Sequence, residues 1–319
     1  MASQQHDISH RWSLVLAGGE GERTRPFIEQ WLGYHKPKQF CAFVGTRSML
    51  QHTWSRADQL TLPEQKVTVV ARHHAAEISA QMMEGACGQV ISQPHNCDTA
   101  AGIFLPLTYI RSWDPQATVI LYPSDHFVFP ENRFVETVRA AIGAAEIMSN
   151  RIMLLGVRPT CLELEYGWIE PGVPLGWSRG SRVHQVQAFL EKPDALRALA
   201  ALSAGALWNT FVLAAKVETL WQLGWQHLSE VMKRFEVLGH AIGTSSEKHT
   251  LEMIYEDMPK RNFSSDLLQC IPERVGVLEM QDVMWSDWGH PARIRETLRA
   301  IDKEPAFPCS RKQSSSLLH

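Results

Sequence analysis

A glycine-rich loop flanked by cationic residues is the first part of the chain that could do chemistry. Three glycines follow the apolar run at residues 13–17, namely Gly18, Gly19 and Gly21. Glycine lets a backbone turn sharply and point its amide N–H groups at an anion. Arg23 and Lys38 follow and can add positive charge to the same anion. This pattern predicts a site for a polyphosphate and for the charge that develops as pyrophosphate leaves, with a plain tight turn as the alternative.

Two familiar nucleotide-binding loops do not fit this segment. The Rossmann fingerprint requires a third glycine where Thr24 stands and a helix that begins there, whereas Pro26 and the polar residues after it predict an extended loop. A P-loop ends in Gly-Lys-Ser or Gly-Lys-Thr, and this loop contains neither. A Rossmann oxidoreductase is therefore a poor explanation of the glycines.

Two aspartates are candidate metal ligands. Asp125 follows the apolar run 118–122, and Asp287 precedes Gly289. In open α/β folds, ligands bind beyond the carboxyl ends of the strands, where Asp125 is expected. Mg2+ prefers oxygen ligands and keeps several waters, so two carboxylates and substrate phosphates make a sufficient site. Taken singly, each aspartate could instead be a helix cap or a turn residue.

The surrounding elements alternate between strand-like and helix-like patterns. Short apolar runs typical of strands occur at 13–17, 67–70, 89–92, 118–122 and 152–157. Amphipathic stretches typical of helices occur at about 74–83, 98–112 and 134–148. This order predicts an α/β fold with a mostly parallel, doubly wound mixed sheet. A Gly- and Pro-rich β-hairpin or lid insertion follows residue 157, then a strand at 182–190 and a largely helical region from 193 to 256.

The composition excludes several classes of partner. The chain has 319 residues, of which 45% are hydrophobic, and a net charge of −3. This charge provides no field that would hold nucleic acid or an anionic membrane. Six cysteines without a CxxC pair indicate reduced thiols, and no apolar run is long enough for a leader or a membrane span. We therefore expect a cytoplasmic protein.

The adjacent pair His73 and His74 invites a metal interpretation. Neighbouring residues on a helix point in different directions, so we expect ordinary surface or capping histidines instead.

Several motifs together carry a family resemblance. The run LAGGEGERTRP followed by KPKQF resembles the amino-terminal signature of the sugar-phosphate nucleotidyltransferases, and PKQF is most similar to the form in mannose-1-phosphate guanylyltransferases. The segments YPSDH, YGWIE, FLEKP, WNT and MWSDWG are similar to further motifs of that family. The resemblance implies a Mg2+-dependent reaction in which a nucleoside triphosphate, with GTP expected, and a sugar 1-phosphate, with mannose 1-phosphate expected, give a nucleotide sugar and pyrophosphate.

The resemblance also implies roles for individual residues. The catalytic residues would be Arg23, Lys38, Asp125 and Asp287, with Asp125 and Asp287 binding the metal. The nucleotide-binding residues would be Leu16, Ala17, Gly18, Gly19, Gly21, Glu22, Arg23, Lys38, Asp98, Thr99 and Asp125. The residues that bind the sugar phosphate would be Gly167, Glu170, Glu191, Lys192 and Asn209.

The motifs depart from the family on the base and sugar sides. Where the family has EPxxRNTA, which helps to read guanine, this chain has Gln93, Cys97 and Asp98 in place of Glu, Arg and Asn. Asp98 is an equally good candidate for a helix cap. Phe211 stands where the family usually has glycine. A different base or sugar, or a non-catalytic regulatory homologue that binds a nucleotide sugar, therefore stays open.

The domain boundaries follow from the motifs. We expect one nucleotidyltransferase domain over residues 10–301 and a C-terminal tail over 302–319, because the last residues show no periodicity. The oligomeric state stays open, with a homodimer as one candidate.

Overall fold

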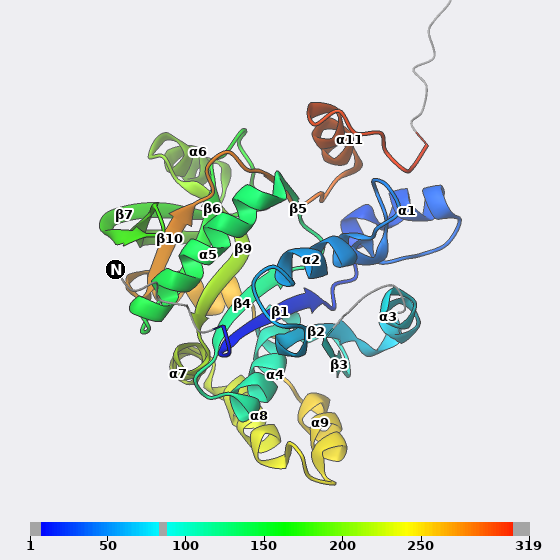
Figure 1. Cartoon of the computed structure of the whole chain (residues 1–319), viewed down its shortest axis with the longest axis vertical. Helices are drawn as coiled ribbons and strands as arrows, with labels where there is room; N and C mark the ends of the chain where they lie inside the picture. The colour runs from blue at the N-terminus through cyan, green and yellow to red at the C-terminus, as the bar shows by residue number, and fades with distance from the viewer. Residues whose placement is uncertain (1–7, 83–87, 309–319) are drawn as a thin grey trace, which may run out of the picture.

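A computed structural model of the chain describes residues 8–82 and 88–308, and its central feature is a nine-stranded sheet (Figure 1). In sheet order the strands are β3 (Gln89–Gln93), β2 (Lys66–Ala71), β1 (Arg11–Ala17), β4 (Thr118–Pro123), β9 (Leu207–Lys216), β6 (Ile152–Val157), β10 (Val275–Glu279), β8 (Ser181–Glu191) and β7 (Gly167–Ser178). A small second sheet pairs β5 (Phe127–Phe129) with β11 (Met284–Ser286).

The sheet is mixed but mostly parallel. Strands β3, β2, β1 and β4 pair in parallel, as do β6 and β10. Strand β9 runs antiparallel between β4 and β6, and β8 runs antiparallel to β10 and β7. The predicted α/β class is confirmed, and the insertion after residue 157 is the β7–β8 hairpin.

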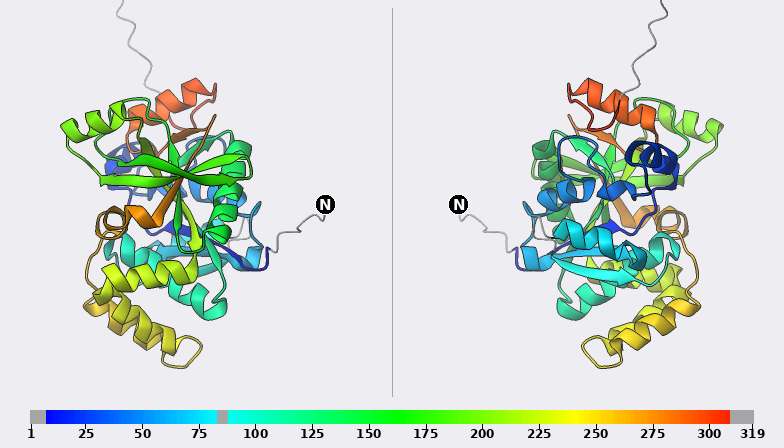
Figure 2. Two further views of the ribbon diagram at one scale, coloured as in Figure 1. Left: turned by 90° about the vertical axis from the view of Figure 1, so that its left-hand side faces the viewer. Right: turned by 90° about the vertical axis from the view of Figure 1, so that its right-hand side faces the viewer.

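Helices cover both faces of the sheet (Figures 1 and 2). One core joins strand residues such as Leu14 to α4 (Asp98–Trp113), α7 (Val217–His227) and α8 (Ser229–Ala241). The other joins residues such as Val15 to α2 (Met49–Ala57) and α5 (Glu131–Ile147). Successive strand residues point to opposite faces, so a strand covered on both faces must be apolar at nearly every position. The remaining helices are α1 (Arg25–Leu32), α3 (Ala75–Met82), α6 (Ala195–Ser203), α9 (Glu247–Glu256), α10 (Phe263–Asp266) and α11 (Pro291–Ala300).

Two local predictions are wrong. The extended loop expected after Pro26 is the helix α1, in which Pro26 occupies the first turn, where its missing N–H has no intrahelical partner to lose. The helical region expected from 193 to 256 contains β9, which lies in the middle of the sheet. Its sequence, LWNTFVLAAK, is buried along most of its length, so it shows no period of two that would separate it from a buried helix.

Residues of the predicted tail pack against the domain. Phe307 is buried in a third core with Ile28 of α1 and Ile294 of α11. The Ala306 amide donates a hydrogen bond to the Phe43 carbonyl at 2.9 Å. Packed structure therefore continues past residue 301. Among the described residues, no helix is both long and apolar enough to cross a membrane.

Candidate active site

The predicted phosphate loop lies at the carboxyl edge of the parallel strands, where β1 ends. Two carbonyls of this segment, those of Ala17 and Gly19, accept hydrogen bonds from Gln39 Nε2 at 2.9 and 2.8 Å. Gly21 adopts φ 66°, and a Cβ there would lie 3.2 Å from both Cβ and the amide nitrogen of Lys38. Glycine is therefore required at position 21 for conformation and for space. The supporting role of Gln39 was not predicted.

Lys38 is the centre of the site. Its side chain is 4% exposed, and Nζ lies 2.8 Å from Asp125 Oδ2 while also donating to the backbone carbonyl of Asp287. Burial alone would raise the pKa of Asp125, but the Lys38 charge and hydrogen bond, together with His126, lower the pKa below its ordinary value. A buried cation thus keeps the carboxylate charged and joins the two predicted metal ligands.

Asp287 is held by four donors. Its Oδ1 accepts from the Tyr166 hydroxyl at 2.5 Å, from Arg293 Nη1 at 2.5 Å and from the Gly289 amide at 2.9 Å. Its Oδ2 accepts from Arg23 Nη2 at 2.8 Å. A Cβ on Gly289 would lie 2.6 Å from Oδ2, so this position has no room for a side chain. The parts played by Tyr166, Arg293 and Gly289 were not predicted.

The environment of Asp287 also fixes its charge. Burial would raise the pKa of this carboxyl, but the Tyr166 hydrogen bond, the charges of Lys38 and His126 and the Gly289 amide lower it well below its ordinary range. Asp287 is therefore ionised throughout the physiological pH range.

The two carboxylates form an oxygen donor set that fits Mg2+. Asp125 is 36% exposed, and its Oδ1 has no partner nearer than His126 Nε2 at 3.8 Å among the described residues. Asp287 Oδ2 accepts from Arg23, whose side chain is 46% exposed. A cation that bound both aspartates would therefore replace the Arg23 guanidinium at Oδ2.

A pocket of about 410 Å3 lies beside the loop, and five of the predicted nucleotide-binding residues line it: Leu16, Gly18, Gly19, Asp98 and Thr99. Five further lining residues were not predicted: Val69, Gln93, Asn96, Gly102 and Lys260. Gln93 is 5% exposed, and its Nε2 has no hydrogen-bond partner among the residues described. The other six predicted nucleotide-binding residues lie outside the lining. Ala17 is buried in β1, Glu22 is exposed where the short 3-10 helix Glu22–Thr24 begins, and the remaining four are Gly21, Arg23, Lys38 and Asp125.

The cap role considered for Asp98 is wrong, because the N-cap of α4 is Cys97 and no side chain caps this helix. Asp98 has φ 68° at the start of α4, and its Oδ1 accepts from the Thr99 amide at 2.6 Å. The same oxygen accepts from Asn262 Nδ2 at 3.3 Å. Asp98 is thus the first residue of α4, and it lines the pocket.

The predicted sugar residues meet where β7, β8 and β9 come together. A Cβ on Gly167 would lie 3.0 Å from Glu191 Oε2 and 3.3 Å from Asn209 Cβ. Burial raises the pKa of Glu191, although Lys192 and Ser264 act against this shift. Lys192 is exposed directly after β8, and Glu170 is half-buried on β7. Three of the five predicted residues thus converge, with Lys192 and Glu170 alongside.

The structure shows how Phe211 is accommodated at a position where the family usually has glycine. Its φ is 60°, in the left-handed region that glycine adopts most easily. The amide of Phe211 donates to Asn209 Oδ1 at 3.1 Å, and its ring packs edge-on against Phe263 with 6.3 Å between centroids. The glycine-like backbone is therefore retained with a bulky side chain.

The segment from Lys260 to Asp266 connects the two halves of the site. Lys260 lines the pocket beside the loop, and the Phe263 amide donates to Thr99 Oγ1 at 2.8 Å. The neighbouring Ser264 lies close enough to Glu191 on the sugar side to lower the pKa of that carboxyl. This segment therefore lies beside both predicted substrate regions.

A comparison of the sequence with protein-family models shows to which family the chain belongs. A family model described as "Nucleotidyl transferase" matches residues 12–304, which include the loop, Lys38 and both aspartates. The chain belongs to the nucleotidyl transferase family. This membership agrees with the α/β fold and with the family suggested by the sequence motifs.

Named relatives of the chain are consistent with that membership. The xanthan biosynthesis protein XanB of Xanthomonas campestris is 27% identical over 86% of this chain and 57% of its own length. A mannose-1-phosphate guanylyltransferase of Escherichia coli is 25% identical over 86% of this chain and 59% of its own. The chain thus spans little more than half the length of these relatives.

A solved structure shows the same architecture. The crystal structure described as a mannose-1-phosphate geranyltransferase from Thermus thermophilus has a TM-score of 0.74 and 27% identity, covering 88% of this chain and 76% of its own.

Proposed function

We propose that this chain transfers a nucleotidyl group from a nucleoside triphosphate to a sugar 1-phosphate and releases pyrophosphate, with GTP and mannose 1-phosphate as its substrates. The observation that carries the proposal is Lys38, a buried cation between the glycine loop, the Asp125 carboxylate and the backbone of Asp287. Such a fixed charge in a site of this kind stabilises a polyphosphate whose negative charge increases during transfer. The relatives named as mannose-1-phosphate guanylyltransferases support the choice of substrates.

The reaction needs positioning more than acid–base chemistry. An oxygen of the sugar 1-phosphate attacks the α-phosphorus, the new P–O bond forms, and the bond to the β-phosphate breaks with its electron pair leaving on pyrophosphate. The attacking phosphate is already ionised, so no general base is required. We assign the triphosphate to the loop amides, Arg23 and Lys38, and the sugar phosphate to Lys192.

Asp125 and Asp287 are the residues that would hold Mg2+. When bound, Mg2+ supplies charge neutralisation and fixes the orientation of the phosphate oxygens. The Arg23 guanidinium donates to Asp287 Oδ2, and the Arg23 side chain is half-exposed. It can therefore leave this carboxylate and bind a substrate phosphate instead.

The choice of base depends on the pocket beside the loop. Its Gln93 amide can both donate and accept hydrogen bonds, whereas a glutamate at this position would only accept. The altered residues here also motivate the second candidate, a regulatory homologue that binds a nucleotide sugar without turnover.

Pyrophosphate release tests both candidates. The protein is assayed with Mg2+ and each of GTP, UTP, dTTP, ATP and CTP against a panel of hexose 1-phosphates that includes mannose 1-phosphate. Turnover with GTP and mannose 1-phosphate supports the full proposal, and turnover with another pair keeps the chemistry but changes the specificity. Folded protein that binds a nucleotide but turns over no pair would contradict the enzyme and favour the regulatory homologue.

A further inference from the structure

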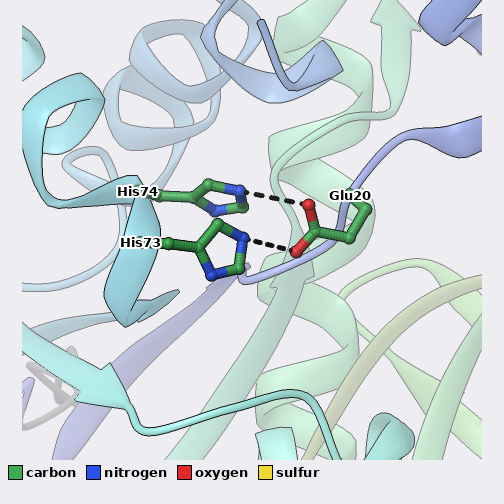
Figure 3. A group of neighbouring side chains, drawn as sticks. All are labelled: Glu20, His73 and His74. Carbon is green, nitrogen blue, oxygen red and sulfur yellow. Dashed lines mark hydrogen bonds and ion pairs between the residues drawn. The ribbon is translucent and has the colours of Figure 1, made fainter. Parts of the chain in front are cut away.

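A cluster outside the proposed reaction joins the glycine loop to the end of β2. Glu20, between Gly19 and Gly21, faces His73 and His74 of the 3-10 helix Arg72–His74 (Figure 3). The distances are 2.8 Å from His73 Nε2 to Glu20 Oε1 and 3.5 Å from His74 Nε2 to Glu20 Oε2. Both imidazoles turn toward the same carboxylate, so the expectation that neighbouring histidines would point apart is wrong here.

The state of His74 indicates that the cluster lacks a component. The residue is 2% exposed, its Nδ1 has no hydrogen-bond partner among the described residues, and its Nε2 has only the long contact with Glu20 Oε2 at 3.5 Å. A buried polar group without a partner is unfavourable unless something else binds it. A neutral imidazole nitrogen is a common ligand of transition-metal cations.

We propose that Glu20, His73 and His74 form a binding site for a transition-metal cation, with Zn2+ as its ligand. One ligand atom from each residue lies within 4.8 Å of the others. Metal bonds of about 2.0–2.2 Å in a tetrahedral site place ligand atoms roughly 3.3 Å apart, so small side-chain movements suffice. Two imidazole nitrogens and one carboxylate favour Zn2+ over Mg2+, which prefers oxygen ligands only.

The site would tie the phosphate loop to the neighbouring strand. Glu20 lies within the loop, whereas the two histidines directly follow β2, so a cation on all three connects segments 53 residues apart in sequence. Three protein ligands leave a fourth tetrahedral position for a water or another oxygen donor. This inference rests on the three side chains and does not depend on the proposed reaction.

Zn2+ titration by calorimetry, with excess Mg2+ present, tests the site. We expect one Zn2+ per chain in the wild type, and a Tm that rises by about 5 °C at a hundredfold excess over Kd. Co2+ in place of Zn2+ should give the visible absorption of a bound tetrahedral ion. The variants H73A and E20Q should each weaken Zn2+ binding by more than about tenfold.

Two controls locate the binding. His249 is exposed on α9, so H249A removes a histidine without touching the cluster and should bind Zn2+ like the wild type. D125N alters the predicted Mg2+ site and should also retain Zn2+ binding. Absence of binding in the wild type, undiminished binding in H73A, or loss of binding in D125N would each overturn the proposal.

Discussion

The phosphate side and the sugar side of the candidate site are built differently. On the phosphate side, Lys38 and Asp287 are buried and tied to each other, and Asp287 has four further donors. On the sugar side, Lys192 is exposed and Glu170 is half-buried. Charges held in place cost little reorganisation during a reaction, whereas open polar groups can adapt to different ligands. We infer from this contrast that the charges for the chemistry are fixed on the phosphate side and that the choice of sugar is set on the sugar side.

The largest expected effect comes from removing the buried cation. We expect K38M to lower kcat/KM for pyrophosphate release by about 10³-fold, because no other buried cation lies between the loop and Asp125 among the described residues. Steady-state assays with the best substrate pair measure the loss. The matched control K248M removes an exposed lysine of α9 and should leave kcat/KM unchanged. A folded K38M protein whose kcat/KM falls less than tenfold would show that the chemistry does not depend on the fixed charges of the phosphate side.

Asp287→Asn tests whether the phosphate side also stabilises the fold. Arg23 and Arg293 would lose a buried carboxylate partner, so we expect a loss of about 3 kcal/mol in the free energy of unfolding and a fall in kcat of about 100-fold. Urea denaturation gives the stability, and D257N is the control because its ion pair with Arg234 lies at the surface. Equal stabilities of D287N and D257N would argue against this structural role.

The two halves should also respond differently to acid. The lowered pKa of Asp287 means that its contribution to stability is complete above its unfolded pKa, near 3.9, and is lost as the pH falls through its lower folded value. Glu191 has a raised pKa, so it takes up a proton at higher pH than Asp287 does. Acid should therefore affect the sugar side first.

The readout is KM for the sugar 1-phosphate as the pH is lowered from 7. We expect KM to rise about threefold as Glu191 is protonated, because a neutral carboxyl is a weaker acceptor for sugar hydroxyls. The E191Q variant has no titrating group at this position, so its KM should change less over the same pH range. Ionisation of the substrate affects both proteins equally, so it cancels when the two pH profiles are compared. Identical pH profiles for the two proteins would exclude Glu191 from sugar binding.

Sequence reasoning could place together those candidate residues that are close to one another in the chain. The loop and Lys38 could be predicted because glycines and cations that follow a buried strand have few other uses. The ring of donors around Asp287 could not, since Arg23 and Asp287 lie 264 residues apart and Tyr166 and Asp287 lie 121 apart. Only the fold brings them together.

The same limit applies to the elements. Strands with turn signals on both sides were predicted correctly, but β9 was assigned to a helical region because both of its faces are covered. Pro26 was taken as a helix breaker, although in the first turn of α1 proline is compatible with a helix. Whether such a segment forms a strand or a helix depends on the elements that pack against it. The periodicity of its sequence contains no information about these neighbours.

The smallest expected effect concerns Phe211, where the sugar side departs from its family. The left-handed backbone favours glycine by about 1 kcal/mol over residues with a Cβ, but the phenyl ring packs on Phe263. F211G should therefore differ from the wild type by less than about 1 kcal/mol in unfolding free energy, since relief of strain offsets lost packing. F211A loses the same packing without that relief and should be about 1 kcal/mol less stable than F211G. If F211A were as stable as F211G in urea denaturation, the backbone at this position would be unstrained, and the phenyl ring would have to be explained by the ligand that the pocket accepts.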